Sequence, residues 1–394
     1  MIAHARHALR LGFSTATIAS VACGHPAVEQ PQPLAAVPAS RLTILARSAN
    51  LTRWSGPAGH AAPTAFGRGL SAAEVATIRG LGFTSVRLVI HLGQLFRPSE
   101  PDSLGQPMLA ELDRALDLLL AQDLGVVIDP HPGARDRRIE TDSTHADAFV
   151  RFWAALARHL SRRNPDRVFL EVMNEPVFKN HPSRWPPLQQ RLLATMRREA
   201  PRHTLIAAGT WWSSSDGLLR LTPVADRNVV YTFHFYEPFI FTHQGETWAE
   251  PPAGKVRGVP YPGDGPGCMD AAAAQRDSGA ARAVRRYCAH GWNAAAIERR
   301  LGSAAAWGRE HGVPVFLGEF GASHKVAPPE ARAAWLHGVR VAAERLGMGW
   351  AIWSFDDRFG LAAKRGPGGA FVVDSGVVRA LGLRPDSVLV TRAR

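Results

Sequence analysis

The sequence predicts a parallel β-sheet closed into a (β/α)8 barrel, the TIM-barrel architecture. From about residue 41 onward, apolar runs typical of buried strands alternate with amphipathic runs typical of helices. Eight runs of the first kind can be counted, and eight strands separated mostly by helices favour closure into a barrel. An open doubly wound sheet is the alternative, but no Gly-x-Gly-x-x-Gly follows an early strand to support it.

Each expected strand is a short run rich in Val, Ile, Leu and Phe, bounded by residues that interrupt regular structure. In chain order these runs cover residues 43–51, 85–90, 125–131, 168–173, 204–208, 229–235, 314–318 and 349–355. Between them, apolar residues recur at helical spacing. The expected helices are 72–80, 109–122, 146–161, 188–199, 294–311 and 330–345.

One long segment departs from this alternation. Residues 242–293, after the sixth strand, are rich in Gly, Pro and Ala and contain Cys268 and Cys288. Loops that follow barrel strands lie at the end of the barrel where active sites are built. We therefore expect a long loop insertion that forms a lid or a groove wall within one catalytic domain, residues 41–394.

The first 22 residues have the features of an export signal. Arg6 and Arg10 precede a mildly apolar stretch, and Ser20-Val21-Ala22 supplies a small-residue cleavage site. The apolar stretch is too short to cross a bilayer stably, and no other run reaches that length. We expect an exported protein, either secreted or periplasmic.

Two further features bear on the compartment. Cys23 directly follows the cleavage site and is a candidate lipid-attachment cysteine, although Ser20 stands where such sites usually carry Leu. Residues 23–40 form a Pro/Ala-rich tether without an expected fold. Cys268 and Cys288 remain as an even pair, which an oxidising compartment would join. No Cys-x-x-Cys spacing indicates a zinc site.

The composition argues against a nucleic-acid-binding protein. The formal net charge is +12, with 46 basic residues, of which only four are lysine. These residues are spread along the whole chain and form no basic arm or helix. Compositional bias explains the arginine content better than a phosphate-binding surface does.

Two strands end in a carboxylate. The segment at residues 168–176 ends Asn174-Glu175-Pro176, and the one at 315–321 contains Glu319. A Glu at the end of a strand buried on both faces is costly without a function. Two such ends facing each other across a pocket provide what glycoside hydrolysis requires: one carboxyl protonates the leaving oxygen, and the other attacks the sugar or activates water.

Further polar and aromatic side chains fall within or at the ends of the expected strands, where barrel active sites assemble. A carboxylate nucleophile needs a cation and hydrogen-bond donors beside it, whereas an acid needs a drier, less cationic setting. An Asn beside the acid can hold the sugar 2-hydroxyl, and a Trp offers a flat face for a pyranose ring. These candidate residues are Arg87, His131, Asn174, His234, Tyr236 and Trp353.

This set resembles glycoside hydrolase family 5, the cellulase family of retaining (β/α)8 barrels. The resemblance covers residues 43–355 and leaves the leader, the tether and the Cys268–Cys288 loop outside its pattern. It implies that Glu175 is the acid/base and Glu319 the nucleophile, that Asn174 contacts the 2-hydroxyl, and that no cofactor is needed. It also implies a supporting shell of Arg87, His131, His234, Tyr236 and Trp353.

The segment at residues 234–248 resembles bacterial endoglucanases, which implies β-1,4-glucan as the polysaccharide substrate. Mannan, xylan, β-1,3-glucan and a bacterial exopolysaccharide are alternatives with the same chemistry. A non-catalytic carbohydrate-binding envelope protein is an alternative of another class, and the intact pair of glutamates argues against it. We expect a monomer.

Several residues have a second interpretation. Asp129, His131 and Asp136 form an acidic and histidine cluster, but their spacing fits no standard set of metal ligands, so we expect no metal. Glu171 is interpreted as structural. Four tryptophans outside the strands are candidate sugar platforms, with one of the adjacent pair expected to face the core. They are Trp54, Trp211, Trp212 and Trp248.

Overall fold

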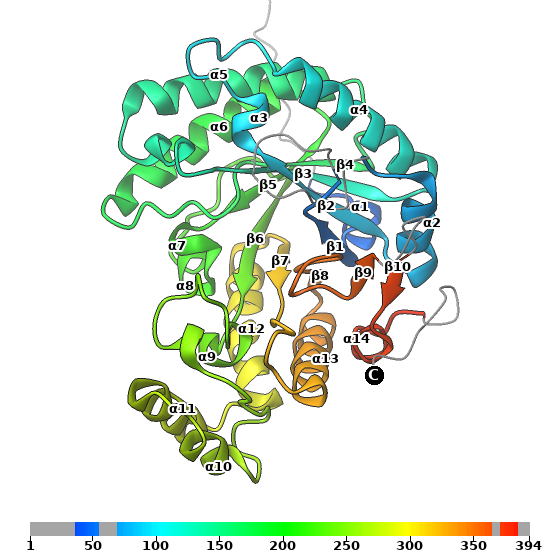
Figure 1. Cartoon of the computed structure of the whole chain (residues 1–394). Helices are drawn as coiled ribbons and strands as arrows, with labels where there is room; N and C mark the ends of the chain where they lie inside the picture. The colour runs from blue at the N-terminus through cyan, green and yellow to red at the C-terminus, as the bar shows by residue number, and fades with distance from the viewer. Residues whose placement is uncertain (1–35, 55–68, 365–370, 385–394) are drawn as a thin grey trace, which may run out of the picture. The chain divides into compact units, whose positions relative to one another are not determined.

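The computed structural model describes residues 36–54, 69–364 and 371–384. Within this part of the chain, eight parallel strands form one closed barrel in sequence order, because β8 pairs with β1 (Figure 1). The predicted export signal, Cys23 and nearly all of the predicted tether lie outside the described residues and stay predictions. The barrel strands are β1 (Arg47–Leu51), β2 (Ser85–His91), β3 (Gly125–His131), β4 (Val168–Glu171), β5 (Thr204–Ala208), β6 (Val229–Phe235), β7 (Val315–Phe320) and β8 (Gly349–Ile352).

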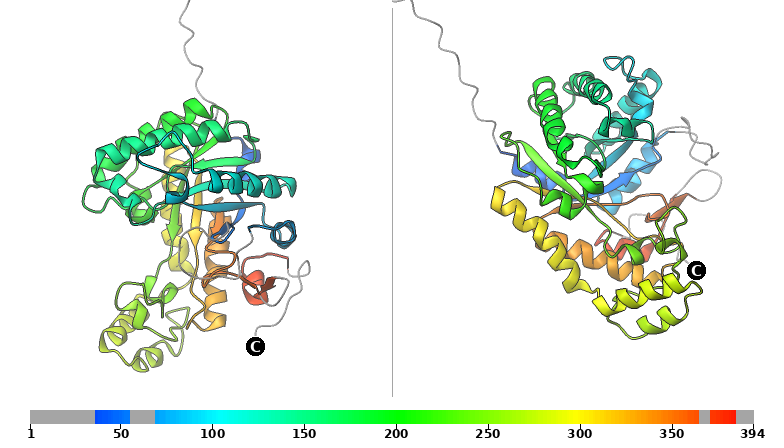
Figure 2. Two further views of the ribbon diagram at one scale, coloured as in Figure 1. Left: turned by 45° about the horizontal axis from the view of Figure 1, so that its top comes forward. Right: turned by 90° about the vertical axis from the view of Figure 1, so that its left-hand side faces the viewer.

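Helices surround the strands, as the alternation of the sequence predicts (Figures 1 and 2). Short helices at the strand ends and near the C-terminus supplement them, and β9 (Ala362–Lys364) pairs antiparallel with β10 (Phe371–Val373). The long helices are α2 (Ala72–Leu81), α4 (Gln106–Ala121), α5 (Ser143–Leu160), α6 (Trp185–Glu199), α12 (Ala294–His311) and α13 (Pro329–Arg345). The short ones are α3 (Leu92–Leu95), α7 (Thr210–Ser213), α8 (Ser215–Leu218), α9 (Phe239–Thr242) and α14 (Ser375–Ala380), with 3-10 turns η1 (Asp136–Glu140), η2 (Pro182–Arg184) and η3 (Ala253–Lys255).

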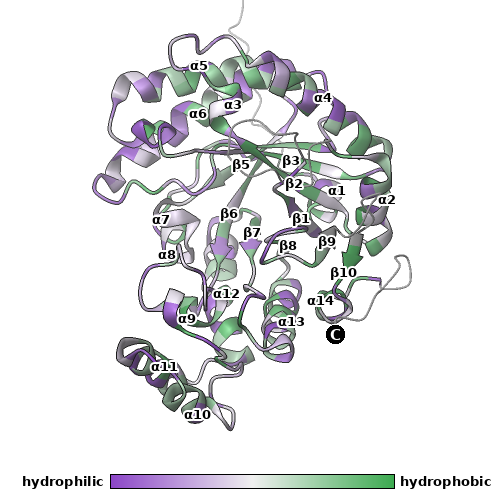
Figure 3. Cartoon of the chain, viewed as in Figure 1, coloured by the Kyte–Doolittle hydropathy of each residue, from purple (hydrophilic) through white to green (hydrophobic). Residues whose placement is uncertain are grey.

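Helix α5 shows why these segments fold as they do. Its N-cap, Asp142, accepts hydrogen bonds from the backbone N–H groups of Thr144 and His145, which would otherwise lack a partner. Its apolar residues recur at helical spacing and are buried, including Phe149 and Trp153. The colouring in Figure 3 shows the same pattern around the barrel, with apolar strands inside and mixed helices outside.

The first expected strand begins later than predicted. Residues 43 and 44 belong to α1 (Ala39–Ile44), which also takes up the last two residues of the predicted tether. Ile44 and Leu45 pack with inward-facing residues of the barrel strands, among them Val127 and Phe169. This segment is apolar because it covers an end of the barrel interior. An apolar segment that covers the barrel and an apolar segment that forms a strand cannot be distinguished by composition.

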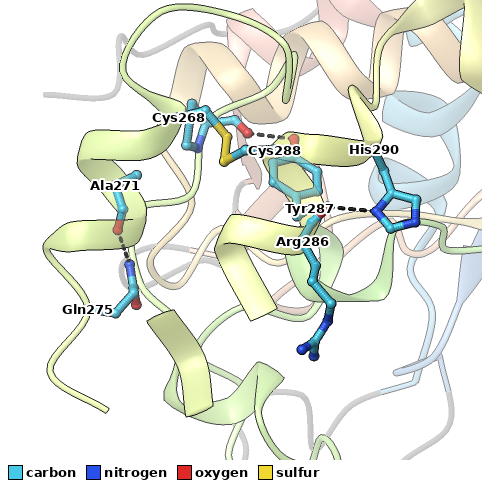
Figure 4. Close-up of a disulfide and its surroundings, with 8 residues drawn as sticks. Cys268, Ala271, Gln275, Arg286, Tyr287, Cys288 and His290 are labelled. Atoms are coloured by element: carbon cyan, nitrogen blue, oxygen red, sulfur yellow. Dashed lines mark hydrogen bonds between the residues drawn. A yellow bond between two sulfur atoms is a disulfide. The ribbon is translucent and has the colours of Figure 1, made fainter. Parts of the chain in front are cut away.

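The expected long loop is largely helical. It contains α10 (Cys268–Ala273) and α11 (Ser278–His290), which pack against each other and project beyond the barrel (Figures 1 and 2). A disulfide joins Cys268 to Cys288 and links the two helices (Figure 4). We call residues 242–293 the excursion. No helix among the described residues is long and apolar enough to cross a membrane.

Candidate active site

A cleft of about 920 Å³ opens at the carboxyl ends of the barrel strands. Its floor comes from residues that follow or end β3, β4, β6, β7 and β8, and the excursion contributes to its side. Of the predicted site residues, all but Arg87 line this cleft, and Arg87 lies buried beneath it. The lining site residues are His131, Asn174, Glu175, His234, Tyr236, Glu319 and Trp353.

Arg87 is the centre of the hydrogen-bond network below the cleft. Its side chain is fully buried, and its Nε and Nη2 donate to the two carboxylate oxygens of Glu171, each at 2.8 Å. Nη1 lies 2.9 Å from Asp129 Oδ2 and 2.8 Å from Glu319 Oε1. Nη2 also donates to Asn174 Oδ1 at 3.0 Å. Burial lowers the pKa of Arg87, but the three carboxylates raise the pKa by more than burial lowers it. The guanidinium therefore stays charged.

Glu319 is positioned by two donors, one in β2 and one directly after β6. Arg87 holds one carboxylate oxygen, and the Tyr236 hydroxyl donates to the other at 2.8 Å. Burial raises the pKa of Tyr236 well above its ordinary value, so this phenol remains a donor. Charge-assisted bonds at both oxygens favour the ionised carboxylate and fix its orientation.

Glu175 sits on strained backbone in the segment that follows β4. Its φ of 43° lies in the left-handed region, which non-glycine residues rarely adopt. Arg137 Nη1 donates to the Glu175 carbonyl oxygen at 2.7 Å and holds this turn. The turn directs the Glu175 carboxyl toward His234, whose Nδ1 is 3.1 Å from Glu175 Oε1 and 3.4 Å from Glu319 Oε2.

The two candidate carboxyl groups therefore face each other. One oxygen of Glu175, one of Glu319 and a ring nitrogen of His234 all lie within 4.8 Å of one another. Carboxyl groups about 5 to 5.5 Å apart characterise retaining glycosidases, whereas inverting enzymes separate them by about 6.5 to 9.5 Å. The arrangement matches the shorter separation.

Burial acts on both carboxyl groups in the same direction, and their hydrogen-bond partners distinguish them. Burial raises the pKa of Glu319 to about 7, while His234 and Arg87 oppose the rise. Burial also raises the pKa of Glu175. Two carboxylates this close resist being ionised together, so they share a proton near neutral pH. We place that proton on Glu175, because Glu319 accepts from a cation and a phenol.

His234 and His131 support this site as neutral rings. Burial lowers the pKa of His234 to about 4 and that of His131 well below its ordinary value. His131 hydrogen-bonds to Asp129 and stacks on Trp353, with ring centroids 5.6 Å apart. Trp353 thus presents a supported apolar surface beside the two glutamates.

Sequence reasoning missed Asn50 and underestimated the acidic partners of Arg87. Asn50, in β1, accepts from Arg87 Nη1 and donates to the carbonyl oxygens of Gly318 and Ile352. A polar residue inside an apolar run was the available signal. Asp129 lies in the Arg87 network rather than in a cluster with Asp136, and Glu171 is structural as predicted.

Of the four tryptophans predicted as sugar platforms, three line the cleft and one does not. Trp54 is wrong as a sugar platform, because its ring is buried and its Nε1 donates to the Val89 carbonyl oxygen at 2.6 Å. Trp211, Trp212 and Trp248 line the cleft. The expectation that one of the adjacent pair faces the core is also wrong, since both line the cleft, Trp211 is partly exposed and Trp212 is 46% exposed.

Glu175, His234 and Glu319 also form a group that could offer ligands to a metal ion. The Arg87 guanidinium, bound to Glu319 at 2.8 Å, already supplies the positive charge at this point. A divalent cation here would lie close to that guanidinium, and the repulsion disfavours it. The contacts fit acid/base chemistry better than metal binding.

Comparisons with known proteins identify the family of the barrel. The cellulase family, glycosyl hydrolase family 5, matches residues 48–358. Endoglucanase 3 of Fibrobacter succinogenes is 26% identical over an alignment of 314 residues, and the match covers 74% of this chain and 46% of that protein. Endoglucanase C of Acetivibrio thermocellus is 27% identical over 290 residues, 72% of this chain and 82% of the relative. A solved hyperthermophilic endo-β-1,4-glucanase in complex with substrate is 26% identical, with a TM-score of 0.70, covering 87% of this chain and 98% of that one.

Arg87→Met should destabilise the fold by about 3–5 kcal/mol at neutral pH, because it leaves buried carboxylates without their cation. Loss of the guanidinium raises the folded-state pKa of Asp129, Glu171 and Glu319. The folded variant then binds protons more readily than the unfolded chain, so the penalty shrinks as pH falls. Urea unfolding at about pH 7.5 and about pH 5 measures both effects.

Arg191→Met is the matched control, because Arg191 pairs with Asp147 on the surface. It should cost no more than about 1 kcal/mol at either pH. An Arg87→Met penalty as small as that of the control, or one that grows toward acid pH, would contradict the role given to Arg87.

Proposed function

The chain belongs to glycosyl hydrolase family 5, the cellulase family of O-glycosyl hydrolases, and from this we propose that it is a retaining endo-β-1,4-glucanase. The observation that carries the proposal is the approach of Glu175 and Glu319 to within 4.8 Å across the cleft. The similarity to proteins named endoglucanases supports a glucan as the substrate, and the similarity to the solved endo-β-1,4-glucanase supports the β-1,4 linkage.

In the first step Glu319 attacks the anomeric carbon while Glu175 donates its proton to the departing glycosidic oxygen. Glu319 is ionised and oriented by Arg87 and Tyr236, so it meets the carbon as a nucleophile. The C–O bond to the leaving sugar breaks, and a glycosyl ester to Glu319 forms. The leaving sugar takes the proton and departs as an alcohol.

In the second step Glu175, now ionised, takes a proton from water, whose oxygen attacks the anomeric carbon and releases Glu319. Glu319 no longer carries negative charge in the ester, so one source of repulsion on the Glu175 carboxylate is gone. Asn174 is held by Arg87 at the floor of the cleft, where it is suited to contact the sugar 2-hydroxyl. Trp353 offers its ring to the pyranose.

We also propose that the protein is exported and acts outside the cytoplasm. The features of residues 1–22 support this, and so does the disulfide between Cys268 and Cys288, since such bonds persist in oxidising compartments.

Glu175→Ala and Glu319→Ala should each lower turnover by about 10²-fold or more. Azide should then distinguish their roles on an aryl β-cellobioside. In Glu175→Ala, azide attacks the glycosyl ester and gives the β-azide; in Glu319→Ala, it attacks the substrate directly and gives the α-azide. Product anomers are read by proton NMR.

Glu111→Ala serves as the control, because Glu111 pairs with Arg114 on the outer surface. It should keep near-normal turnover and form no azide product. If either catalytic variant also kept near-normal turnover, or if the azide anomers were exchanged, the assigned roles would be wrong.

The identity of the substrate is tested by measuring product release from cellulose derivatives, mannan, xylan, β-1,3-glucan and exopolysaccharide. We expect the highest kcat/KM on β-1,4-glucan, with a rapid fall in viscosity that marks cleavage within chains. Preferred release from another polymer would keep the reaction and replace the substrate. If the protein is retained on glucan gels but releases no product, the result would support a carbohydrate-binding protein instead of an enzyme.

Export is tested in the producing cell by fractionation and N-terminal sequencing. We expect a mature chain outside the cytoplasm that begins at Cys23, and mass spectrometry of its first peptide shows whether that cysteine carries lipid. A cytoplasmic protein that retains its first 22 residues would disprove this proposal.

A further inference from the structure

Helix α11 carries an unusual concentration of uncompensated charge. It contains Arg282, Arg285 and Arg286 and no acidic residue. Many other arginines pair with carboxylates, as Arg163 does with Asp113 and Asp117. For the side chains of the three α11 arginines, no hydrogen bond or ion pair is found within the described part of the chain. Their guanidinium groups therefore remain available to a ligand.

Only one of these arginines lines the cleft. The cleft-lining residues of α11 are Ala283, Arg286 and Tyr287, whose spacing of three and four places them on one face of the helix. Arg282 and Arg285 are exposed but are not among the lining residues. The same helix thus provides one arginine beside the proposed substrate path and two away from it.

The helix that presents Arg286 is firmly anchored. The disulfide links α11 to α10, and the buried Tyr287 donates from its hydroxyl to the Pro260 carbonyl oxygen at 2.7 Å. Asp277 caps the helix N-terminus and pairs with Lys255 at 2.8 Å. Figure 4 shows the Arg286 side chain extending away from the disulfide. Anchoring reduces the entropy lost when the guanidinium binds a ligand.

The surroundings of Arg286 suit a sugar chain with a charged group. Trp248 and Trp292 line the same cleft, and Trp248 is 59% exposed with its Nε1 bonded to Glu246, which leaves its ring available to a pyranose. Glu250 also lines the cleft, but within the described residues it forms no ion pair with Arg286. The N–H donors of the Arg286 guanidinium therefore have no carboxylate partner among the described residues.

We propose that Arg286 forms a distal subsite for an anionic substituent, a carboxylate or a phosphate, on the polysaccharide held in the cleft. The planar guanidinium can bind either group with two parallel hydrogen bonds. This inference rests on the proposed function, because it assumes that a polysaccharide occupies the cleft. It makes the excursion a determinant of substrate choice, apart from the chemistry at Glu175 and Glu319.

The experiment compares carboxymethyl cellulose with hydroxyethyl cellulose at matched substitution, since both are β-1,4-glucans and only the first is charged. The readout is the ratio of kcat/KM on the charged polymer to that on the neutral one. Arg286→Ala should lower this ratio by about fivefold at low salt, the size expected of one exposed ion pair. The difference should fade at about 0.5 M salt.

Arg285→Ala is the matched control, since it removes the same charge from the same helix outside the cleft. Its ratio should stay near that of the wild type. Equal falls in the two variants would mean that the overall positive field attracts the polymer, and no fall in Arg286→Ala would mean that no subsite exists; either result overturns the proposal. The same ratio, measured with phosphorylated cellulose in place of carboxymethyl cellulose, shows whether Arg286 prefers a phosphate or a carboxylate.

The failure of this inference can be distinguished from failure of the proposed function. If the wild type cleaves neither polymer, the glucanase proposal fails, and affinity electrophoresis in gels that contain each polymer reads the subsite without turnover. Retardation by the charged polymer that is weaker in Arg286→Ala than in Arg285→Ala then supports the subsite. Equal retardation of the two variants overturns it.

Discussion

The active site depends on one buried cation, Arg87. It lies inside the barrel with no exposed surface and binds Glu171, Asp129 and Glu319. A guanidinium in this position is stable only because carboxylates surround it, and the carboxylates are tolerable only because of the guanidinium. Its contacts therefore fix the position of Glu319 and, through Asn174, the segment that follows β4.

This constraint also explains how two similar carboxyl groups acquire different roles. Glu319 is buried and Glu175 is half-buried, and desolvation raises the pKa of each. Arg87 and Tyr236 stabilise negative charge on Glu319, whereas the carboxyl of Glu175 meets the neutral ring of His234. In the proposed mechanism, the proton shared by the pair is thus held where the leaving group needs it, and the strained backbone at Glu175 holds that proton close to Glu319.

The strand ends were predictable because a polar residue that closes a buried apolar run has few structural uses. Glu175, Glu319 and His234 could be found this way, and the structure places them together. Ile44 could not be placed correctly, since an apolar residue that covers the barrel end has the same composition as a strand. Trp54 shows the same difficulty, because the sequence does not distinguish a tryptophan that is buried, as this one is, from one that is exposed as a sugar platform. The helices of the excursion were hidden by Gly and Pro on either side of short Ala-rich segments.

The barrel and the excursion separate two demands that are difficult to meet together. Chemistry requires groups fixed to a fraction of an ångström, and strands joined by backbone hydrogen bonds around Arg87 provide that rigidity. Substrate choice requires a surface that can differ without disturbing those groups. A helical hairpin inserted after β6 meets this need, because its own disulfide and the Tyr287 contact stabilise it locally. On the proposal that Arg286 contacts the substrate, residues on the cleft face of this hairpin can change the preferred polymer while the Glu175–Glu319 geometry stays the same.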